Sequence, residues 1–361
     1  MALATATIDF CALRANLARV KSLAPDSQVM AVLKANAYGH GLVPIAQQLA
    51  DADAFAVARI EEALALRTGG ITKPIVLLEG FFKASDIEIM LANNFQTVVH
   101  DEYQLEALEQ AQLAGAIKVW LKVDTGMHRL GINPESINTF YRRLKDCPYV
   151  QDEVNLMTHF ACADDNQDAY NETQLQLFQT LVADKPEPLC LANSAAIINY
   201  PQSHGDWVRP GLMMYGVSPV KNTFSAQLQL TPVMTLSSEV IAVRPVRQGE
   251  PVGYGGHWRA DKDTYLAVVA IGYGDGYPRH AQNGTPVLIN AQRYPLVGRV
   301  SMDMITVDIG PDPSAVAVGD EAIMWGRELA IEEIAACADT IAYELLCNIT
   351  PRVSYQYIAS S

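Results

Sequence analysis

The feature that most constrains the fold of this chain is a regular alternation of short apolar runs with amphipathic runs between residues 29 and 216. The apolar runs predict eight strands, at residues 29–33, 54–57, 75–78, 97–100, 118–123, 155–159, 188–192 and 207–209. The runs between them predict helices, including those at 60–67, 85–92, 102–114 and 174–183. Eight strands alternating with helices over roughly 200 residues indicate an α/β fold, a TIM-like (β/α)8 barrel. An open doubly wound sheet is the alternative, but it would need a glycine-rich first turn and fewer strands.

The pattern changes near Thr231. Apolar runs at 234–243, 264–271, 286–289 and 304–309 are separated by Gly, Pro and Asp, with one helical run at 331–346. Short apolar runs separated by turn residues predict a mainly-β C-terminal domain. We therefore expect a barrel domain over residues 1–230 and a β-rich domain over residues 231–361. The strand-like residues 5–10, which precede a helical run at 13–23, are candidates to join the second domain.

Composition limits the possible partners. A chain of 361 residues is long enough for two cores, and a net charge of −14 argues against nucleic acid and anionic membranes as partners. No apolar stretch approaches the length of about 18 residues that suggests a membrane span, and the N-terminal residues lack signal-peptide features. The six cysteines form no C-x-x-C pair, which predicts reduced, mostly buried thiols and a cytoplasmic location. The histidines are dispersed, so we expect no metal in the site.

Lys34 closes the first apolar run, where the predicted strand at 29–33 breaks into a loop. Burial penalises the charged form of an amine, so a lysine here is costly unless it is paired or used covalently. A Schiff base with an aldehyde cofactor, commonly pyridoxal 5′-phosphate, is one such use. A lysine that extends from a strand end to water is the ordinary alternative. Tyr38, flanked by small residues and Gly39, favours a ligand near Lys34.

Other chemically capable side chains also fall at or just after predicted strand ends. They are Lys122 with Arg129, His159, Asn193 with Ser194, and Arg209. The carboxyl ends of the strands form the face that carries the active site in this kind of barrel. Ser194 and Gly211 follow the seventh and eighth strands, where such barrels often bind phosphate.

Seven segments of the chain resemble segments of alanine racemases, and they occur in the family's order over nearly the whole chain. They are Ala31–Gly41, Leu121–Gly131, Thr158–Ala161, Ala192–Ala195, Arg209–Leu212, Gly253–Gly255 and Arg299–Asp303. The resemblance implies a homodimer that binds pyridoxal phosphate. It also implies active sites shared between the barrel of one subunit and the C-terminal domain of its partner.

The resemblance further implies two acid/base residues on opposite faces of the substrate. Lys34 would carry the cofactor as an aldimine and serve one face, and Tyr254 would serve the other. Because phenols are weak acids, Tyr254 needs nearby positive charge or hydrogen-bond donors, and His159, linked to Arg209, is its implied partner. A tyrosine in a glycine-rich turn is the ordinary alternative for Tyr254.

Several residues are implied to hold the cofactor. Arg209 resembles the residue that faces the pyridine nitrogen of the cofactor, and that nitrogen would stay unprotonated opposite a permanent cation. The alternative is that Arg209, Pro210 and Gly211 merely mark the end of a strand. The implied phosphate ligands are the hydroxyls of Tyr38 and Ser194 and the N–H groups of Gly211 and Leu212. Ser194 is also a candidate N-cap of the helix that follows it.

For the substrate carboxylate, the resemblance implies Arg129 and the backbone N–H of Met302. Lys122 is implied to be a carbamate that orients Arg129, whereas a plain ion pair of Lys122 with Asp124 is the alternative.

The resemblance also implies that Tyr273 and Asp303 line the access route. One position departs from the family pattern: many relatives have a tyrosine immediately before Arg352, where this chain has Pro351. Tyr355 or water are candidates to replace that phosphate ligand.

The sequence thus predicts an alanine racemase that interconverts L- and D-alanine and supplies D-alanine for peptidoglycan. A fold-related decarboxylase of amino acids is one alternative. A non-enzymatic protein of pyridoxal-phosphate homeostasis is another, although such proteins resemble the barrel alone.

Overall fold

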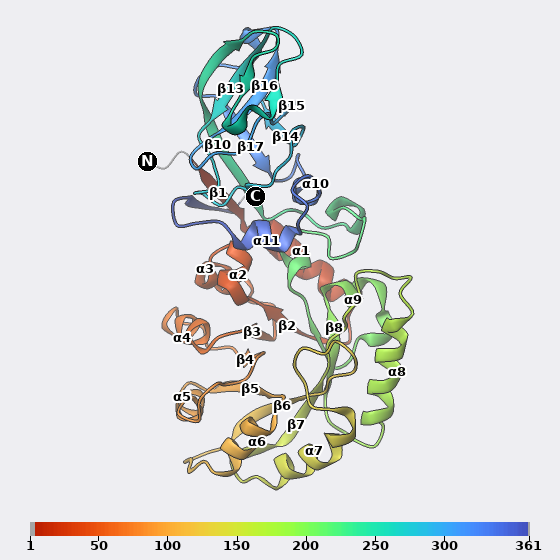
Figure 1. Cartoon of the computed structure of the whole chain (residues 1–361). Coiled ribbons are helices and arrows are strands. Elements are labelled where there is room, and N and C mark those ends of the chain that lie inside the picture. Colours follow the sequence, from red (N-terminus) through yellow and green to blue (C-terminus); the bar gives the residue numbers. More distant parts are fainter. Residues whose placement is uncertain (1–3, 360–361) are drawn as a thin grey trace. The chain divides into compact units, whose positions relative to one another are not determined.

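The computed structural model describes residues 4–359, which form two compact units (Figure 1). One unit comprises residues 14–214 and 219–223, and the other comprises residues 4–13, 215–218 and 224–359. The longest helix in the described part of the chain has 14 residues, and none there combines the length and apolar character needed to cross a bilayer.

The first unit is built on a closed barrel of eight parallel strands in chain order. The strands are β2 (Gln28–Val32), β3 (Ala54–Val57), β4 (Ile75–Leu77), β5 (Phe95–Val99), β6 (Ile117–Lys122), β7 (Val150–Met157), β8 (Leu189–Asn193) and β9 (Trp207–Arg209). Every residue of β3 and β4 is buried. Strands covered on one face by helices and on the other by the barrel interior need continuous apolar runs. The predicted (β/α)8 barrel is confirmed.

Helices alternate with these strands and pack around the barrel (Figure 1). They are α1 (Phe10–Leu23), α3 (Leu42–Gln48), α4 (Ile60–Thr68), α5 (Asp86–Ala92), α6 (Glu102–Glu109), α7 (Ile137–Asp146), α8 (Tyr170–Val182) and α9 (Ser194–Asn199). On α7 the buried residues Ile137, Phe140 and Leu144 recur at helical spacing. The predicted helix at 102–114 is too long, because residues 111–116 include no buried side chain to pack a further turn.

The second unit is mainly β, as predicted. Its strands are β1 (Thr5–Asp9), β10 (Met234–Val246), β13 (Thr264–Val269), β14 (Pro286–Ile289), β15 (Gln292–Pro295), β16 (Ile305–Gly310), β17 (Glu321–Trp325) and β18 (Ser354–Ile358). β1 pairs antiparallel with β10 and parallel with β18. Burial alternates along β1 and β16, as expected for strands with one face on the core. A separate pair joins β11 (Pro251–Val252) to β12 (Trp258–Arg259).

The single helical run predicted at 331–346 is wrong. The chain forms two helices there, α10 (Ile331–Cys337) and α11 (Ala342–Cys347). Asp339 between them has φ of 51°, a left-handed conformation that ends a right-handed helix. Aspartate tolerates this conformation better than most residues.

All six cysteines are free. Only Cys147 and Cys190 are fully buried, and Cys347 is exposed, so the prediction of mostly buried thiols is wrong. Cys347 ends the short helix α11, whose inward positions are Ala342, Leu345 and Leu346.

Candidate active site

The chain reverses its handedness immediately after Lys34. The residues from Ala35 to Tyr38 have φ between 51° and 55°, so α2 (Lys34–Gly39) is a left-handed turn. This conformation costs about 1–2 kcal/mol per L-residue. Strain of this kind persists only where the surroundings fix it, and such places are often functional.

Polar contacts hold this turn. The Asn36 side-chain oxygen accepts the N–H of Leu42 at 2.8 Å, and His40 Nδ1 lies 2.9 Å from the Tyr38 carbonyl oxygen. Because a carbonyl only accepts, Nδ1 carries the proton. Burial lowers the pKa of His40 to about 4, so the ring is neutral at pH 7. A neutral histidine therefore fixes the backbone of Tyr38.

Tyr38, Ser194 and Gly211 lie together at the same face of the barrel. A Cβ atom at Gly211 would lie only 2.6 Å from Tyr38 Oη, so the glycine leaves room for the phenol. Ser194 Oγ accepts the N–H of Gly211 at 2.7 Å and that of Met213 at 3.4 Å. A serine oxygen that accepts still has its own O–H to donate. The hydroxyls of Tyr38 and Ser194 thus lie on either side of the Gly211 backbone, which has no side chain, and this arrangement fits a phosphate group.

Ser194, the candidate N-cap of α9, does not cap this helix. Asn193 caps α9, and its side-chain oxygen accepts the N–H of Ala196 at 3.0 Å. Ser194 is free to contact Gly211 because its neighbour performs the capping. Leu212, which begins the short helix η3 (Leu212–Tyr215), is buried.

Arg209 ends β9 and is 5% exposed. Its Nη1 donates to the carbonyl oxygen of Cys190 at 2.9 Å and lies 3.0 Å from Cys190 Sγ. Its Nη2 donates to the carbonyl oxygens of Thr158 and Leu191 and lies 3.2 Å from His159 Nδ1. The Nε–H makes no hydrogen bond with any residue among 4–359. One N–H of a permanent cation is therefore left for an acceptor such as a pyridine nitrogen.

His159 follows β7 and lies beside Arg209. Burial, and then the positive charge of Arg209, hold its pKa well below the usual value, so the ring is neutral. Arg209 can only donate, so His159 Nδ1 accepts and the ring proton is on Nε2. The ring can thus offer an N–H to a further acceptor.

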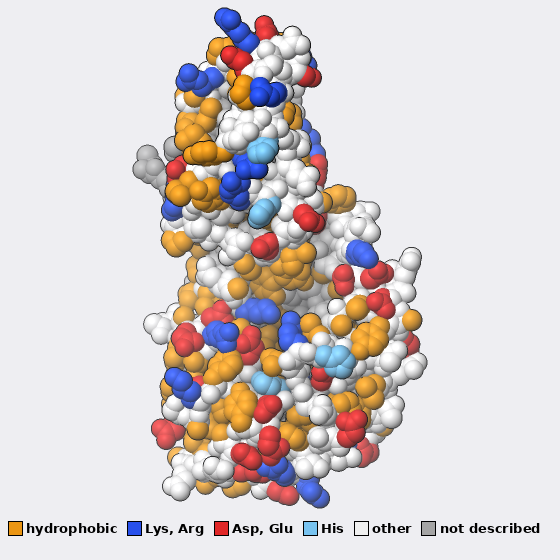
Figure 2. All heavy atoms as spheres, viewed as in Figure 1, with side chains coloured by type: hydrophobic (Ala, Val, Ile, Leu, Met, Phe, Trp, Pro, Cys, Tyr) orange, Lys and Arg blue, Asp and Glu red, His pale blue; other side chains and the backbone are white. Residues whose placement is uncertain are grey.

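Lys122 ends β6 and is 8% exposed. Burial lowers its pKa to about 8, with further lowering from the charges of Arg209, Arg129 and Lys34. Three positive charges therefore act on Lys122 at the carboxyl ends of the strands. In Figure 2, blue Lys and Arg side chains gather where β2 and β3 run in Figure 1. A concentration of positive charge in an acidic chain favours an anionic ligand.

The ion pair of Lys122 with Asp124, the alternative left open by the sequence, is not formed. Asp124 accepts the N–H groups of Gly126 at 2.9 Å and His128 at 3.0 Å. No carboxylate within the described residues 4–359 forms an ion pair with Lys122.

The remaining predicted site residues belong to the second unit. Tyr254 begins the turn η5 (Tyr254–Gly256) and is 68% exposed. The two glycines of this turn and Gly253 immediately before it have positive φ. Met302 and Tyr273 are also exposed. The Met302 carbonyl oxygen accepts the N–H of Gly274 at 2.9 Å, which joins the Met302 turn to the loop of Tyr273. This unit thus presents Tyr254, Tyr273 and Met302 at its surface.

Arg352 was not predicted as a site residue, yet it fixes Asp303. Its Nη2 donates to Asp303 at 2.8 Å, and its Nε lies 3.1 Å from Asp275. The Asp275 side chain in turn accepts the N–H of Gly272 at 2.9 Å. The sequence offers no local signal for this network, because Asp275 and Arg352 are 77 positions apart (352 − 275).

At the position that departs from the family pattern, Pro351 is exposed. Tyr355 lies in β18 and its ring stacks on Tyr357 with centroids 6.2 Å apart. Burial raises the pKa of Tyr355 to about 12, which favours the neutral phenol.

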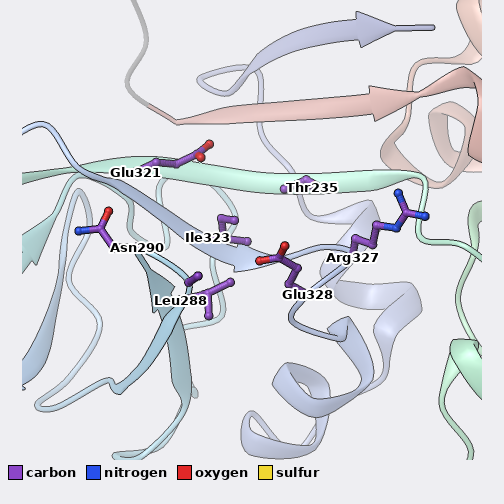
Figure 3. Close-up of a pocket in the computed structure, with 8 residues that line it drawn as sticks. Thr235, Leu288, Asn290, Glu321, Ile323, Arg327 and Glu328 are labelled. Carbon is purple, nitrogen blue, oxygen red and sulfur yellow. The ribbon is translucent and has the colours of Figure 1, made fainter. Parts of the chain in front are cut away.

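A separate depression lies in the second unit and contains no predicted site residue. Figure 3 shows the side chains of Arg327 and Glu328 at one end of it and Asn290 and Glu321 at the other. Leu288 and Ile323 also line it and lie between these two ends.

Comparison with known proteins agrees with this architecture. Residues 8–219 match the family model for the alanine racemase N-terminal domain, and residues 233–357 match that for the alanine racemase C-terminal domain. An alanine racemase of Edwardsiella ictaluri is 56% identical over 99% of both chains.

Solved structures give the same result. A biosynthetic alanine racemase from Pseudomonas aeruginosa aligns with a TM-score of 0.96 at 43% identity, over 99% of this chain and 100% of the other. An alanine racemase from Bartonella henselae, with covalently bound pyridoxal phosphate, aligns with a TM-score of 0.90 at 30% identity, over the same shares. The fold, the order of the two domains and the full-length identity together place this chain in the alanine racemase family.

Proposed function

We propose that this protein is a pyridoxal-phosphate-dependent racemase that interconverts L- and D-alanine. The observation that carries the proposal is the basic cluster at the barrel face, in which the positive charges of Lys34, Arg129 and Arg209 all act on the buried Lys122. No carboxylate among residues 4–359 forms an ion pair with Lys122. Such a cluster suits the phosphate of the cofactor and the carboxylate of an amino acid.

The residues at this face fit the cofactor. Tyr38, Ser194 and the backbone of Gly211 and Leu212 would hold the phosphate, and the Nε–H of Arg209 would meet the pyridine nitrogen. When bound through Lys34, pyridoxal phosphate supplies the electron sink that acidifies the Cα–H bond of an amino acid.

Two side chains would move the proton. Lys34 Nζ would take or return it at one face of the substrate Cα, and Tyr254 Oη would do so at the opposite face. The Nε2–H of His159 would stabilise the phenolate of Tyr254. A neutral His159 donates through one nitrogen only, so its proton on Nε2 supports this role.

The substrate carboxylate would be bound by Arg129 and the backbone N–H of Met302. A carbamate on Lys122 would orient Arg129 and neutralise part of the cluster. Carbamylation needs a neutral amine, and the lowered pKa of Lys122 raises the neutral fraction at physiological pH.

The active form would be a homodimer in which Tyr254 of each chain serves the barrel of its partner. Tyr254, Met302 and Tyr273 are 68%, 52% and 39% exposed, and large apolar side chains exposed on one domain favour a protein partner. Tyr273 and Asp303 would then line the access route, and Tyr273 with Tyr254 would narrow it and select small substrates.

The product D-alanine would supply peptidoglycan synthesis. The decarboxylase and the non-enzymatic homeostasis protein are less well supported, since the match to the racemase family includes the C-terminal domain that carries Tyr254.

Borohydride reduction followed by peptide mapping tests the proposal. A pyridoxyl group should be found on Lys34, and racemisation of L-alanine should be lost in Lys34→Ala. A label on any other lysine would contradict the proposed cofactor site.

A further inference from the structure

We propose that Glu62 is a positioning residue for Lys34, because its carboxylate fixes the first peptide group of the left-handed turn. The proposal rests on the proposed function in one respect, namely that Lys34 carries the cofactor. Glu62 lies on α4, 28 positions after Lys34 (62 − 34), and has no place among the residues that contact cofactor or substrate in the scheme above.

The two oxygens of the Glu62 carboxylate have different tasks. Oε2 accepts the N–H groups of Ala58 at 2.9 Å and Arg59 at 3.1 Å, the usual contact of a glutamate in the first turn of a helix. Oε1 accepts the N–H of Ala35 at 2.7 Å. β2 and β3 are neighbours in the barrel, so one carboxylate ties together the loops that follow two adjacent strands.

The contact with Ala35 matters because of where Ala35 lies. Its N–H belongs to the peptide bond that joins it to Lys34, and it is the first of the residues with positive φ. The direction of this N–H fixes the backbone of Lys34 on its C-terminal side. Asn36 and His40 restrain the later part of the turn, whereas Glu62 restrains its start.

Without this restraint, Ala35 would be drawn toward negative φ, which L-alanine prefers. That change would redirect the Lys34 side chain while leaving the barrel strands in place. We therefore expect the carboxylate to act on the rate and affinity of cofactor attachment rather than on the fold.

A matched pair of variants tests this role. Glu62→Gln keeps the shape of the side chain but leaves one acceptor oxygen for two sets of N–H groups. Glu61→Gln is the control, because Glu61 is exposed in the same first turn of α4 and loses the same charge. Measurements on the full-length protein with pyridoxal phosphate should show about tenfold weaker cofactor affinity for Glu62→Gln. Its kcat should fall and its KM for alanine should change little, with Glu61→Gln near the unaltered protein.

Hydrogen exchange provides a test without substitution. In the unaltered protein the Ala35 amide should be protected, although the Ala35 side chain is exposed. Free exchange at Ala35, or equal cofactor affinity and kcat in the two variants, would overturn the positioning role. If Glu62→Gln fails to fold, the exchange rate of Ala35 decides. Failure of the proposed function is a distinct result, in which borohydride leaves no pyridoxyl group on Lys34 of the unaltered protein.

Discussion

Arg209 Nη2 lies 3.2 Å from His159 Nδ1, and this one contact determines which nitrogen of the histidine holds its proton. A guanidinium has donors only, so Nδ1 must accept and Nε2 must carry the hydrogen. The same cation opposes a second proton on the ring, as burial does. His159 is therefore held as a neutral donor beside a permanent positive charge.

We expect nitrogen NMR of the labelled protein to show His159 as the neutral Nε2–H tautomer at pH 8 and still at the pH where an ordinary histidine gains its second proton, because its pKa is held well below the usual value. Arg209→Met should raise the pKa of His159, because it removes the second-largest cause of the depression. Protonation of His159 at the pH of an ordinary histidine in the unaltered protein would contradict this electrostatic picture.

Acid should destabilise the protein in part through His40. The pKa of His40 falls from 6.5 to about 4 on folding. Between these pH values the His40 ring is protonated in the unfolded chain and neutral in the folded chain. Stability is thus lost as the pH falls from 6.5 to about 4, by about 3 kcal/mol from this residue. Urea unfolding at pH 7 and pH 4.5 measures the loss. His40→Gln should be less stable at pH 7 but should show a smaller further loss at pH 4.5, and an equal loss would count against the assignment to His40.

The architecture was predictable because it depends on patterns that local sequence records. Strands such as β3 and β4 are buried throughout, so their apolar runs mark them directly. The break between α10 and α11 was missed because the run at 331–346 keeps helical periodicity, whereas Asp339 ends the helix through its own φ. Hydrophobic periodicity indicates which face of a helix is buried, but it does not indicate a change of φ at a single residue.

The site was predictable in its residues and less so in its geometry. Ala35 and Ala37 are good formers of right-handed helix, so their left-handed turn has no signal in the sequence. The role of Ser194 was ambiguous because its partner, the N–H of Gly211, is 17 positions away. Contacts of this length, like that of Glu62 with Ala35, exist only once the barrel has closed.

Tyr254→Phe tests the assignment of two bases. The variant should still bind pyridoxal phosphate, because the phenol is not among the proposed cofactor ligands. Exchange of the Cα proton with solvent should fall about 100-fold or more for one enantiomer of alanine, while the other enantiomer keeps most of its exchange. Equal survival of exchange for both enantiomers, measured by proton NMR in D2O, would indicate one base that serves both faces.

Lys122 should carry a carbamate. An amine must be neutral to attack carbon dioxide, so modification should increase as the pH rises toward about 8, the lowered pKa of Lys122. At pH 6 the ammonium should dominate and the modification should be largely lost. Carbon NMR with labelled bicarbonate follows the carbamate, and Lys118, which pairs with Glu153 at the protein surface, is the internal control. An unmodified Lys122 with full activity in buffer depleted of carbon dioxide would remove the modification from the mechanism.

Mixed dimers test whether two chains build each site. Lys34 lies in the barrel unit and Tyr254 in the C-terminal unit, and each of the variants Lys34→Ala and Tyr254→Phe should be nearly inactive alone. If Tyr254 serves the partner's barrel, a hybrid dimer holds one site with both substitutions and one site with neither.

Random exchange of subunits makes about half of the dimers hybrid, so about a quarter of the unaltered activity should return. If both residues served one site within a single chain, every site would keep a lesion. Inactivity of a mixture whose subunits have demonstrably exchanged would therefore reject the shared site.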